Sequence, residues 1–351
     1  MKFNLIIVSN IIDMSNSKIL QIKPLGFPWE TLDPFLFCVH HKDDYPAGKG
    51  DMSPNASLDG RQIGQDFTVK DGWRMYHGQK IPGFPYHPHR GFETVTITET
   101  GLIDHADSLG AAGRFGDGDV QWMTAGKGVQ HSEMFPMLHQ DKGNPLEFFQ
   151  LWLNLPKDKK FVQPNFNMIW SEDVPKVEIV DDNGRSTEIR IIAGSLNGIA
   201  AESPAPDSWA TDTTNEVAIW TIKIEAGSKW TLPKAKSSVN RMLYFYRGES
   251  MKVDDTHIDE YHSIQISADE SIDLNAFDND VYLLLLQGQP INEPIVQHGP
   301  FVMNSQEEIQ EAFSDFRRTQ FGGWPWPLQE QVHAREKGRF ALYADGREEL
   351  K

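Results

Sequence analysis

Two short motifs of this 351-residue chain carry side chains that can bind a metal ion. The first is the pair His87 and His89, separated by a proline, and the second is the pair His131 and Glu133, separated by a serine. Residues i and i+2 of an extended strand point to the same face, so each motif presents two donor groups together. If the two strands face each other, three imidazoles and one carboxylate form a four-ligand cage. Such a donor set resembles redox non-haem iron sites more than closed structural zinc.

The spacing leaves the fourth ligand open. Glu93 has the same parity as His87 and His89, in the arrangement HxH-x3-E that is usual for the first motif of the cupin superfamily. Its carboxylate can replace or join that of Glu133. Alternatively it lies behind a ligating histidine and orients the imidazole ring.

The remaining histidines show no comparable pattern. His40 and His41 are adjacent and therefore alternate faces of a strand, so they do not both reach one site easily. Three others are expected at surface or loop positions: His77, His105 and His139. The histidines of the second half form no visible set, which predicts no metal site there.

Large apolar side chains flank the two motifs and could form a substrate pocket. They are Phe84, Phe92, Trp122 and Met134. Ordinary packing in the protein core is the alternative interpretation of these four residues.

Apolar and polar residues alternate with period two along much of the chain, which predicts β-strands. We therefore expect strands to position the two motifs. This alternation is clear at residues 94–99, 147–156, 188–193, 217–225 and 242–246. Residues 281–286 (VYLLLL) are apolar throughout and predict a fully buried strand. Many short strands joined by Gly- and Pro-rich turns predict an all-β fold of sandwich or barrel type.

One helix is predicted near the C-terminus. Ser305 and Glu308 fit a capping box, apolar residues follow at helical spacing up to Phe316, and Gly322 and Gly323 end the pattern. The GWPWP segment after it suits an extended run on a surface groove, because proline cannot donate to a strand ladder. The polar tail beyond is expected to be only partly ordered.

The length suits two domains. A charged stretch bounded by prolines at residues 156–164 separates two strand-rich halves. We therefore predict an N-terminal metal-binding domain at 14–160, a C-terminal domain without a metal site at 161–322, and a tail at 323–351.

The composition excludes some classes of partner. A net charge of −17 disfavours direct binding to nucleic acid and to anionic membranes. No apolar run reaches the ~18 residues that a membrane span needs. The single cysteine, Cys38, forms no intrachain disulfide and fits a reducing compartment, so a cytoplasmic protein is expected.

The N-terminus begins MKFNLIIVSNII, which has the outline of an export signal. Its apolar core is short and no small-x-small cleavage site follows. We expect Met14 to be the natural start, or residues 1–13 to form a frayed strand.

Three longer motifs resemble the pirins, a branch of the cupin superfamily. They are HPHRGFETV at 87–95, GDVQWMTAGKGVQHSEM at 118–134 and GQPINEPIVQHGPFVMN at 288–304. The likeness runs from about residue 33 to 322, and the GGWPWP segment resembles bacterial members. The resemblance implies a bicupin, two face-to-face β-barrel domains with a short C-terminal helix. It also implies one iron in the N-terminal barrel, held by His87, His89, His131 and Glu133, which favours Glu133 over Glu93.

The resemblance implies two alternative functions. Some pirins are similar to quercetin 2,3-dioxygenases, which implies a small aromatic flavonol and dioxygen as substrates, carbon monoxide release, and Glu133 as both ligand and catalytic base. Other pirins look like metal- and redox-dependent regulators that bind transcription factors or metabolic enzymes.

Iron(II) is the expected ion, with Mn, Ni, Cu and Zn as alternatives, because ligand type alone does not fix the metal. Pirins are often monomers, so a monomer is expected. A cupin isomerase that acts without metal is a third interpretation, and the four intact ligands speak against it.

Overall fold

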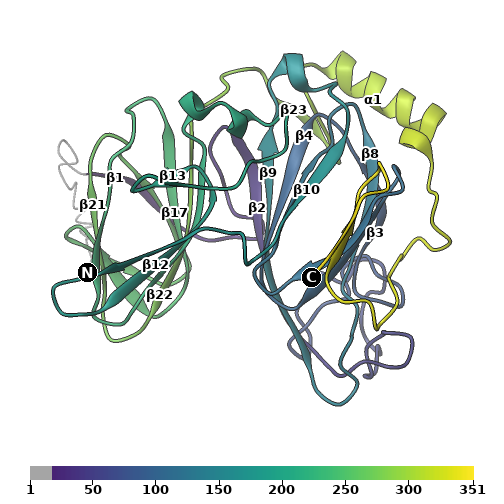
Figure 1. Cartoon of the computed structure of the whole chain (residues 1–351), viewed down its shortest axis with the longest axis horizontal. Helices are drawn as coiled ribbons and strands as arrows, with labels where there is room; N and C mark the ends of the chain where they lie inside the picture. The colour runs from purple at the N-terminus through teal and green to yellow at the C-terminus, as the bar shows by residue number, and fades with distance from the viewer. Residues whose placement is uncertain (1–17) are drawn as a thin grey trace, which may run out of the picture.

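The computed structural model describes residues 18–351. The expectations for residues 1–13 and for a start at Met14 lie outside this range. Two β-barrels stand side by side, and each is built from two sheets (Figure 1). No helix within residues 18–351 is long and apolar enough to cross a membrane.

A five-stranded and a six-stranded sheet form the first barrel. The five-stranded sheet has the order β10-β7-β4-β9-β2, with β2 (Phe35–Tyr45), β4 (Phe92–Thr100), β7 (Val120–Thr124), β9 (Asn144–Asn154) and β10 (Asn165–Ile169). The six-stranded sheet has the order β26-β25-β6-β5-β8-β3, with β3 (Gly83–His89), β5 (Leu102–Asp107), β6 (Ala112–Gly116), β8 (Val129–Met134), β25 (Phe340–Leu342) and β26 (Glu348–Leu350). β3 is therefore an edge strand of its sheet.

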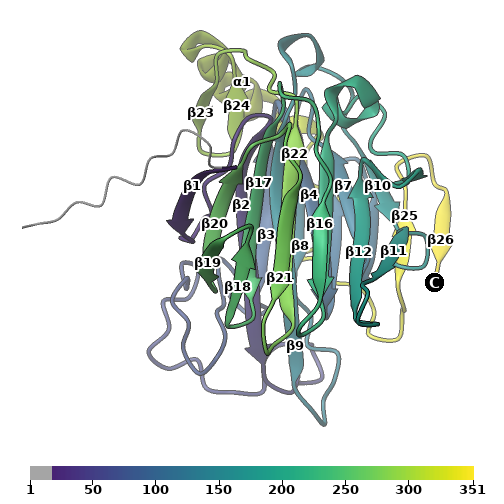
Figure 2. The ribbon, with the colours of Figure 1, turned by 90° about the vertical axis from the view of Figure 1, so that its left-hand side faces the viewer.

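A seven-stranded and a four-stranded sheet form the second barrel, seen face-on in Figure 2. The larger sheet has the order β1-β20-β17-β22-β15-β12-β11, with β1 (Ile19–Pro24), β11 (Lys176–Val180), β12 (Ser186–Ala193), β15 (Ala218–Ile224), β17 (Asn240–Arg247), β20 (His262–Ile266) and β22 (Val281–Gly288). The smaller sheet has the order β16-β21-β18-β19, with β16 (Lys229–Leu232), β18 (Ser250–Val253), β19 (Thr256–Asp259) and β21 (Ile272–Ala276).

Short elements connect these sheets. Two small hairpins are β13 (Ser195–Leu196) with β14 (Ile199–Ala200) and β23 (Val296–His298) with β24 (Phe301–Met303). The 3-10 turns are η1 (Lys157–Lys159), η2 (Trp209–Thr211), η3 (Thr213–Asn215) and η4 (Gln320–Gly322). Helix α1 spans Gln306–Thr319 and begins with the predicted capping box of Ser305 and Glu308.

The predicted strands are confirmed, since the six predicted segments overlap β4, β9, β12, β15, β17 and β22. Sheet membership, however, does not follow chain order. β1 pairs with β20 of the second barrel, whereas β10 pairs with β7 of the first. The expectation of a partly ordered tail is wrong, because β25 pairs with β6 and extends the first barrel. The buried guanidinium of Arg114 donates to tail carbonyls, including that of His333 (3.0 Å), which holds the tail against the sheet.

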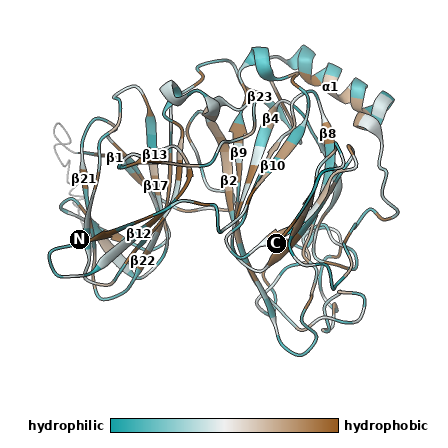
Figure 3. Ribbon diagram, in the orientation of Figure 1, coloured by the Kyte–Doolittle hydropathy of each residue, from teal (hydrophilic) through white to brown (hydrophobic). Residues whose placement is uncertain are grey.

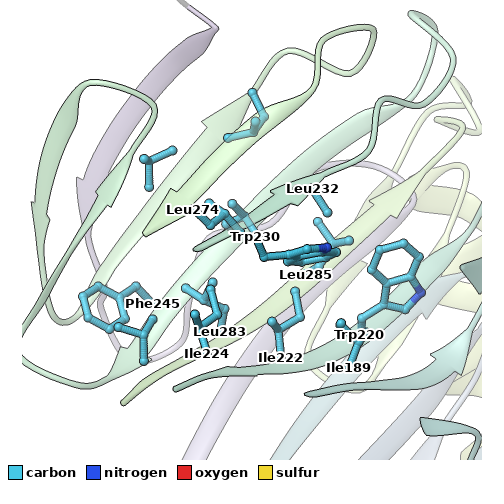
Figure 4. Packing of buried hydrophobic residues seen from close by; sticks show 14 of the residues in the cluster. Ile189, Trp220, Ile222, Ile224, Trp230, Leu232, Phe245, Leu274, Leu283 and Leu285 are labelled. Atoms are coloured by element: carbon cyan, nitrogen blue, oxygen red, sulfur yellow. The ribbon is translucent and has the colours of Figure 1, made fainter. Parts of the chain in front are cut away.

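The barrels meet along a shared apolar core, and Figure 3 shows apolar residues on the strands that lie between them. Phe149 and Leu151 of β9 belong to the same buried cluster as Tyr244 of β17 and Leu284 of β22. The interior of the second barrel holds a separate cluster of leucine, isoleucine and tryptophan side chains (Figure 4). Both faces of β9 are therefore buried, one inside the first barrel and one against the second.

Candidate metal centre

Strands β3 and β8 bring three histidines together. His87 lies directly opposite His131 in the antiparallel ladder, and His89 is two residues along β3. The ring centroids of the three imidazoles are 4.5 to 4.9 Å apart. Each ring offers a nitrogen within 4.8 Å of the other two. Pro88 fits between the two histidines of β3 because an edge strand can leave one backbone position unpaired.

Burial sets the protonation of these rings. It lowers the pKa of His87 to about 4 and holds the pKa values of His89 and His131 well below their usual range. The three imidazoles are therefore neutral at pH 7, which is the form that binds a metal ion. His87 Nδ1 donates to the Pro85 carbonyl oxygen (2.9 Å), so its Nε2 carries the free lone pair.

Several ring nitrogens have nothing to bond to. His89 Nδ1 and both ring nitrogens of His131 are buried and lack a hydrogen-bond partner among the described residues. A buried polar atom without a partner costs free energy unless a ligand satisfies it. The unpartnered nitrogens and the neutral donor set together fit a bound metal ion.

Glu133 reaches from β8 toward the opposite sheet. Its carboxylate accepts hydrogen bonds from Gln150 Nε2 at 2.8 and 3.0 Å and from Thr96 Oγ1 at 3.2 Å. Burial raises the pKa of the Glu133 carboxyl, while the Gln150 amide acts to lower it. Glu133 Oε2 lies 3.9 Å from His131 Nε2. Two atoms that each bind one ion at about 2.1 Å lie within roughly 4.2 Å of each other, so this separation suits shared coordination.

A pocket of about 440 Å³ adjoins the imidazoles. Its aromatic lining is Phe37, Phe67, Phe84, Tyr86 and Trp152, and its polar lining includes His41, His87, His89, Glu133 and Gln150. Gly299 and Pro300, from the β23–β24 hairpin, complete the wall. Of the four predicted pocket residues, Phe84 lies in this lining and Phe92 packs against His89 with ring centroids 5.1 Å apart.

The structure does not bring the other expected residues to the site. Trp122 belongs to the core between the barrels, and Met134 alternates with Glu133 and so points to the other face of β8. Glu93 is also on the barrel interface, where its carboxylate accepts from Thr124 Oγ1 (2.7 Å) and Ser208 Oγ (2.5 Å) and from no imidazole. The expected role of Glu93 as an orienting partner of a histidine is therefore wrong. The chain turns at Gly91 between β3 and β4, and this turn breaks the parity on which the expectation rested.

Two histidines contribute more than the sequence indicated. His105 was expected at a surface or loop position, yet it is fully buried on β5 opposite Glu133, with its ring centroid 5.6 Å from that of His131. Its Nε2 lies 3.4 Å from Asp107 Oδ2. The i, i+2 spacing of His105 and Asp107 was a signal that could have identified it, since it repeats the spacing of the metal motifs.

His41 lines the pocket, while its neighbour His40 turns to the other face and contacts Glu147 (3.0 Å), as the alternation of faces predicted. The Tyr76 hydroxyl donates to Asp43 Oδ2 (2.6 Å) and therefore accepts from His41 Nδ1 (2.9 Å). This chain of bonds fixes the His41 tautomer and leaves Nε2 with its lone pair.

Comparisons with known proteins support this assignment of the fold. Residues 29–153 match the pirin family model, and residues 219–322 match that of the pirin C-terminal cupin domain. A Pseudomonas aeruginosa protein provisionally named as a quercetin 2,3-dioxygenase is 39% identical over 244 residues, which are 69% of this chain and 80% of the relative. Human pirin is 33% identical over 252 residues, 70% of this chain and 80% of its own length.

A solved structure is similar along nearly its whole length. The quercetin 2,3-dioxygenase from Acinetobacter baumannii has a TM-score of 0.68 at 29% identity, and the match covers 87% of this chain and 98% of that one. The predicted fold class is thereby confirmed: an all-β bicupin with one short C-terminal helix. With a relative 39% identical across four-fifths of its length and a family domain matched in each barrel, the chain belongs to the pirin family of the cupin superfamily.

Proposed function

We propose that this pirin is a metal-dependent dioxygenase that cleaves quercetin or a related flavonol with dioxygen. The observation that carries the proposal is the convergence of three neutral, buried imidazoles beside a pocket with an aromatic wall. The names of two similar proteins, from Pseudomonas aeruginosa and Acinetobacter baumannii, support the same substrate class. We place the protein in the cytoplasm as a monomer.

His87, His89, His131 and Glu133 would hold the ion, which we propose to be iron(II). Three nitrogens and one oxygen suit that ion, although Mn, Ni, Cu and Zn accept the same donors. A bound ion of this kind supplies Lewis-acid polarisation of oxygen ligands and one-electron redox chemistry.

The chain's own residues bind the substrate and handle its proton. The aromatic rings of Phe84 and Trp152 form apolar walls that suit a flat flavonol and exclude water. A carboxylate oxygen of Glu133 accepts the proton of the flavonol hydroxyl, while the Gln150 amide holds the carboxylate in place. His41 Nε2 accepts a hydrogen bond from a second hydroxyl group, because its Nδ1 is already committed to Tyr76.

The test is to purify the protein without chelators and to measure metal content by mass spectrometry, oxygen uptake with quercetin, and carbon monoxide release. We expect one equivalent of metal and coupled uptake and release, with both lost in Glu133→Gln and His131→Ala. Glu93→Gln is the matched control, since it makes the same change in a buried carboxylate on the opposite face of the barrel wall and should retain activity. Metal without oxygen uptake across a flavonol panel would refute the dioxygenase, and no metal after reconstitution would refute the site.

A metal- and redox-dependent regulatory role is the second candidate, and one contact favours it. Arg90 follows His89 directly, and its guanidinium donates to Asp315 of the surface helix α1 (3.1 Å). A shift of the metal-binding strand could therefore reach the surface on which a transcription factor or a metabolic enzyme would bind. Hydrogen exchange of α1 should then differ between the ferrous and ferric forms, and identical exchange would count against this role.

A further inference from the structure

The second barrel contains a pocket of its own, far along the chain from the metal motifs. It measures about 740 Å³, and its wall includes Ala193, Ala218, Trp220, Arg241 and Gln287. Among residues 18–351, the only cluster of three or more metal-donor side chains is the histidine group of the first barrel. The described residues of this pocket therefore form no candidate metal site.

Arg241 distinguishes the pocket from the rest of the molecule. Five arginines in the described chain are buried, and four of them have a carboxylate partner. The pairs are Arg61 with Asp66, Arg74 with Asp43, Arg90 with Asp315 and Arg114 with Asp104. Arg241 is 2% exposed and forms no ion pair with any described residue. A buried charge without a counter-charge is costly, so an anion bound from solution would stabilise this guanidinium.

The guanidinium is held in a fixed position with one nitrogen left over. Nε donates to Gln287 Oε1 (2.7 Å), which lies directly opposite on β22, and Nη2 donates to the Pro233 carbonyl oxygen (2.8 Å). Nη1 is buried and has no hydrogen-bond partner. Burial lowers the pKa of Arg241 to about 10, which still leaves the group charged at pH 7. The two N–H groups on Nη1 are thus free to bind an acceptor oxygen.

The charges around the pocket also favour an anion. Lys234 and Lys236 lie in its wall together with Glu202 and Glu216. The Glu216 carboxylate is engaged by Lys236, whose Nζ lies 3.1 Å from Oε1 and whose backbone N–H donates to Oε2 (3.1 Å). Glu216 is the one acidic group that acts on the Arg241 pKa, and it does not neutralise the guanidinium by contact.

The remaining wall is apolar. Trp220 stands at one end of the packed core of the second barrel (Figure 4), and its Nε1 donates to the Ala193 carbonyl oxygen (3.1 Å). The indole therefore offers the pocket an apolar surface and no free donor. Ala218 and Pro233 add further apolar surface. A ligand that suits these walls has an anionic head and an apolar body.

We infer that the second barrel binds a small organic carboxylate, with a carboxylate oxygen on Arg241 Nη1 and its apolar body against Trp220. The inference does not depend on the flavonol reaction or on the metal. Because Nε and Nη2 are already engaged, the carboxylate binds through one oxygen on Nη1. A charge-assisted hydrogen bond in a buried site supplies most of the selectivity over a neutral analogue.

Benzoate, with benzamide as its neutral analogue, is the probe. Calorimetry on the metal-loaded full chain should show saturable binding of benzoate and at least about tenfold weaker binding of benzamide. Arg241→Gln should lose at least about tenfold in benzoate affinity while keeping the metal content of the unmodified protein. The matched control is Arg247→Gln, which makes the same change on the same strand at a guanidinium that is paired with Glu147 (3.1 Å), and its benzoate affinity should be unchanged.

A crystal of the unmodified protein soaked with 4-bromobenzoate keeps the test independent of any variant. The bromine anomalous signal is expected in the Trp220 pocket, with the carboxylate on Arg241. Bromine found only at other positions, equal benzoate affinity in Arg241→Gln, or saturable binding of inorganic phosphate without binding of benzoate would each overturn the inference.

Discussion

The contact between Gln150 and Glu133 permits a sharp test of the metal centre. Replacing Gln150 with leucine removes two hydrogen bonds, at 2.8 and 3.0 Å, from a carboxylate that is 3% exposed. Hydrogen bonds to a charged group contribute about 1.5–3 kcal/mol. Since 1.4 kcal/mol corresponds to a factor of ten, metal affinity should fall roughly ten- to hundredfold.

Two effects act in the same direction. Without the amide, the carboxylate is free to rotate away from His131, so the ion meets a less ordered donor set. The loss of the amide, which acts to lower the Glu133 pKa, also makes the buried carboxyl easier to protonate, and a metal must then displace that proton. Thr96→Val should have a smaller effect, because Thr96 makes one longer bond of 3.2 Å to the same carboxylate.

The assay is competition of the chelator-stripped protein against a chromogenic chelator for ferrous iron under anaerobic conditions. Gln130→Leu is the control, since Gln130 lies on the same strand as Glu133 but points to the opposite face, where Nε2 donates to the Gln320 carbonyl oxygen (2.6 Å). Its metal affinity should stay within about twofold of the unmodified protein. Unchanged affinity in Gln150→Leu would refute the reasoning, and tighter binding would mean that Gln150 holds Glu133 back from the ion.

Three further predictions concern other buried polar groups. His41→Phe should lower kcat/KM for quercetin by up to about tenfold without loss of metal, because it removes one neutral hydrogen bond in the pocket; a steady-state oxygen assay with metal analysis checks this. Burial lowers the pKa of Lys160 to about 8, so between pH 8 and 10.5 the unfolded chain binds more protons than the folded chain. The free energy of unfolding should therefore rise by up to about 3 kcal/mol as the pH increases across that window. Urea unfolding should show a smaller rise in Lys160→Met. Arg114→Met should lower the free energy of unfolding by about 3–5 kcal/mol, because it leaves Asp104 buried without a counter-charge; urea unfolding against Arg318→Met, whose exposed pair with Asp315 should cost far less, provides the comparison.

The strands and the helix were predictable from local sequence. Period-two alternation marked β4, β9 and β17, and the capping box marked the start of α1. The three histidines were also predictable, because i, i+2 spacing on a strand places donor atoms on one face wherever the strand lies in the fold.

The direction in which each strand face points could not be predicted in the same way. The apolar parity of β9, with Phe149 and Leu151, packs against the second barrel, whereas the mixed parity, with Gln150 and Trp152, faces the metal site. If the more apolar face of a strand is assumed to point into its own barrel, the two faces of β9 are assigned incorrectly. The reason is that the outer face of this sheet is also buried, against the second barrel. The same reversal explains why Trp122 was expected in the pocket and lies at the interface instead.

Sheet membership depended on contacts between distant segments. β1 and β10 each pair with strands of the other half of the chain, and β25 pairs with β6 more than two hundred residues earlier. No local pattern encodes such pairings, since register is set by the buried surface that the partner strand offers. The tail in particular is polar in sequence, and the Arg114 guanidinium supplies donors for its carbonyls.

We expect the second barrel to influence the metal centre, although its described residues hold no comparable ligand cluster. The three histidines lie on one sheet of the first barrel, and the donors that hold Glu133 lie on the opposite sheet, at Thr96 and Gln150. That opposite sheet is backed by the second barrel, because Leu151, which follows Gln150, packs in the shared core. A cavity made at Leu151 would relax the strand on which Gln150 stands, whereas an equal cavity in the interior of the second barrel, at Leu285, would not touch this strand. Leu151→Ala should consequently lower metal affinity as well as stability, and Leu285→Ala should lower stability alone.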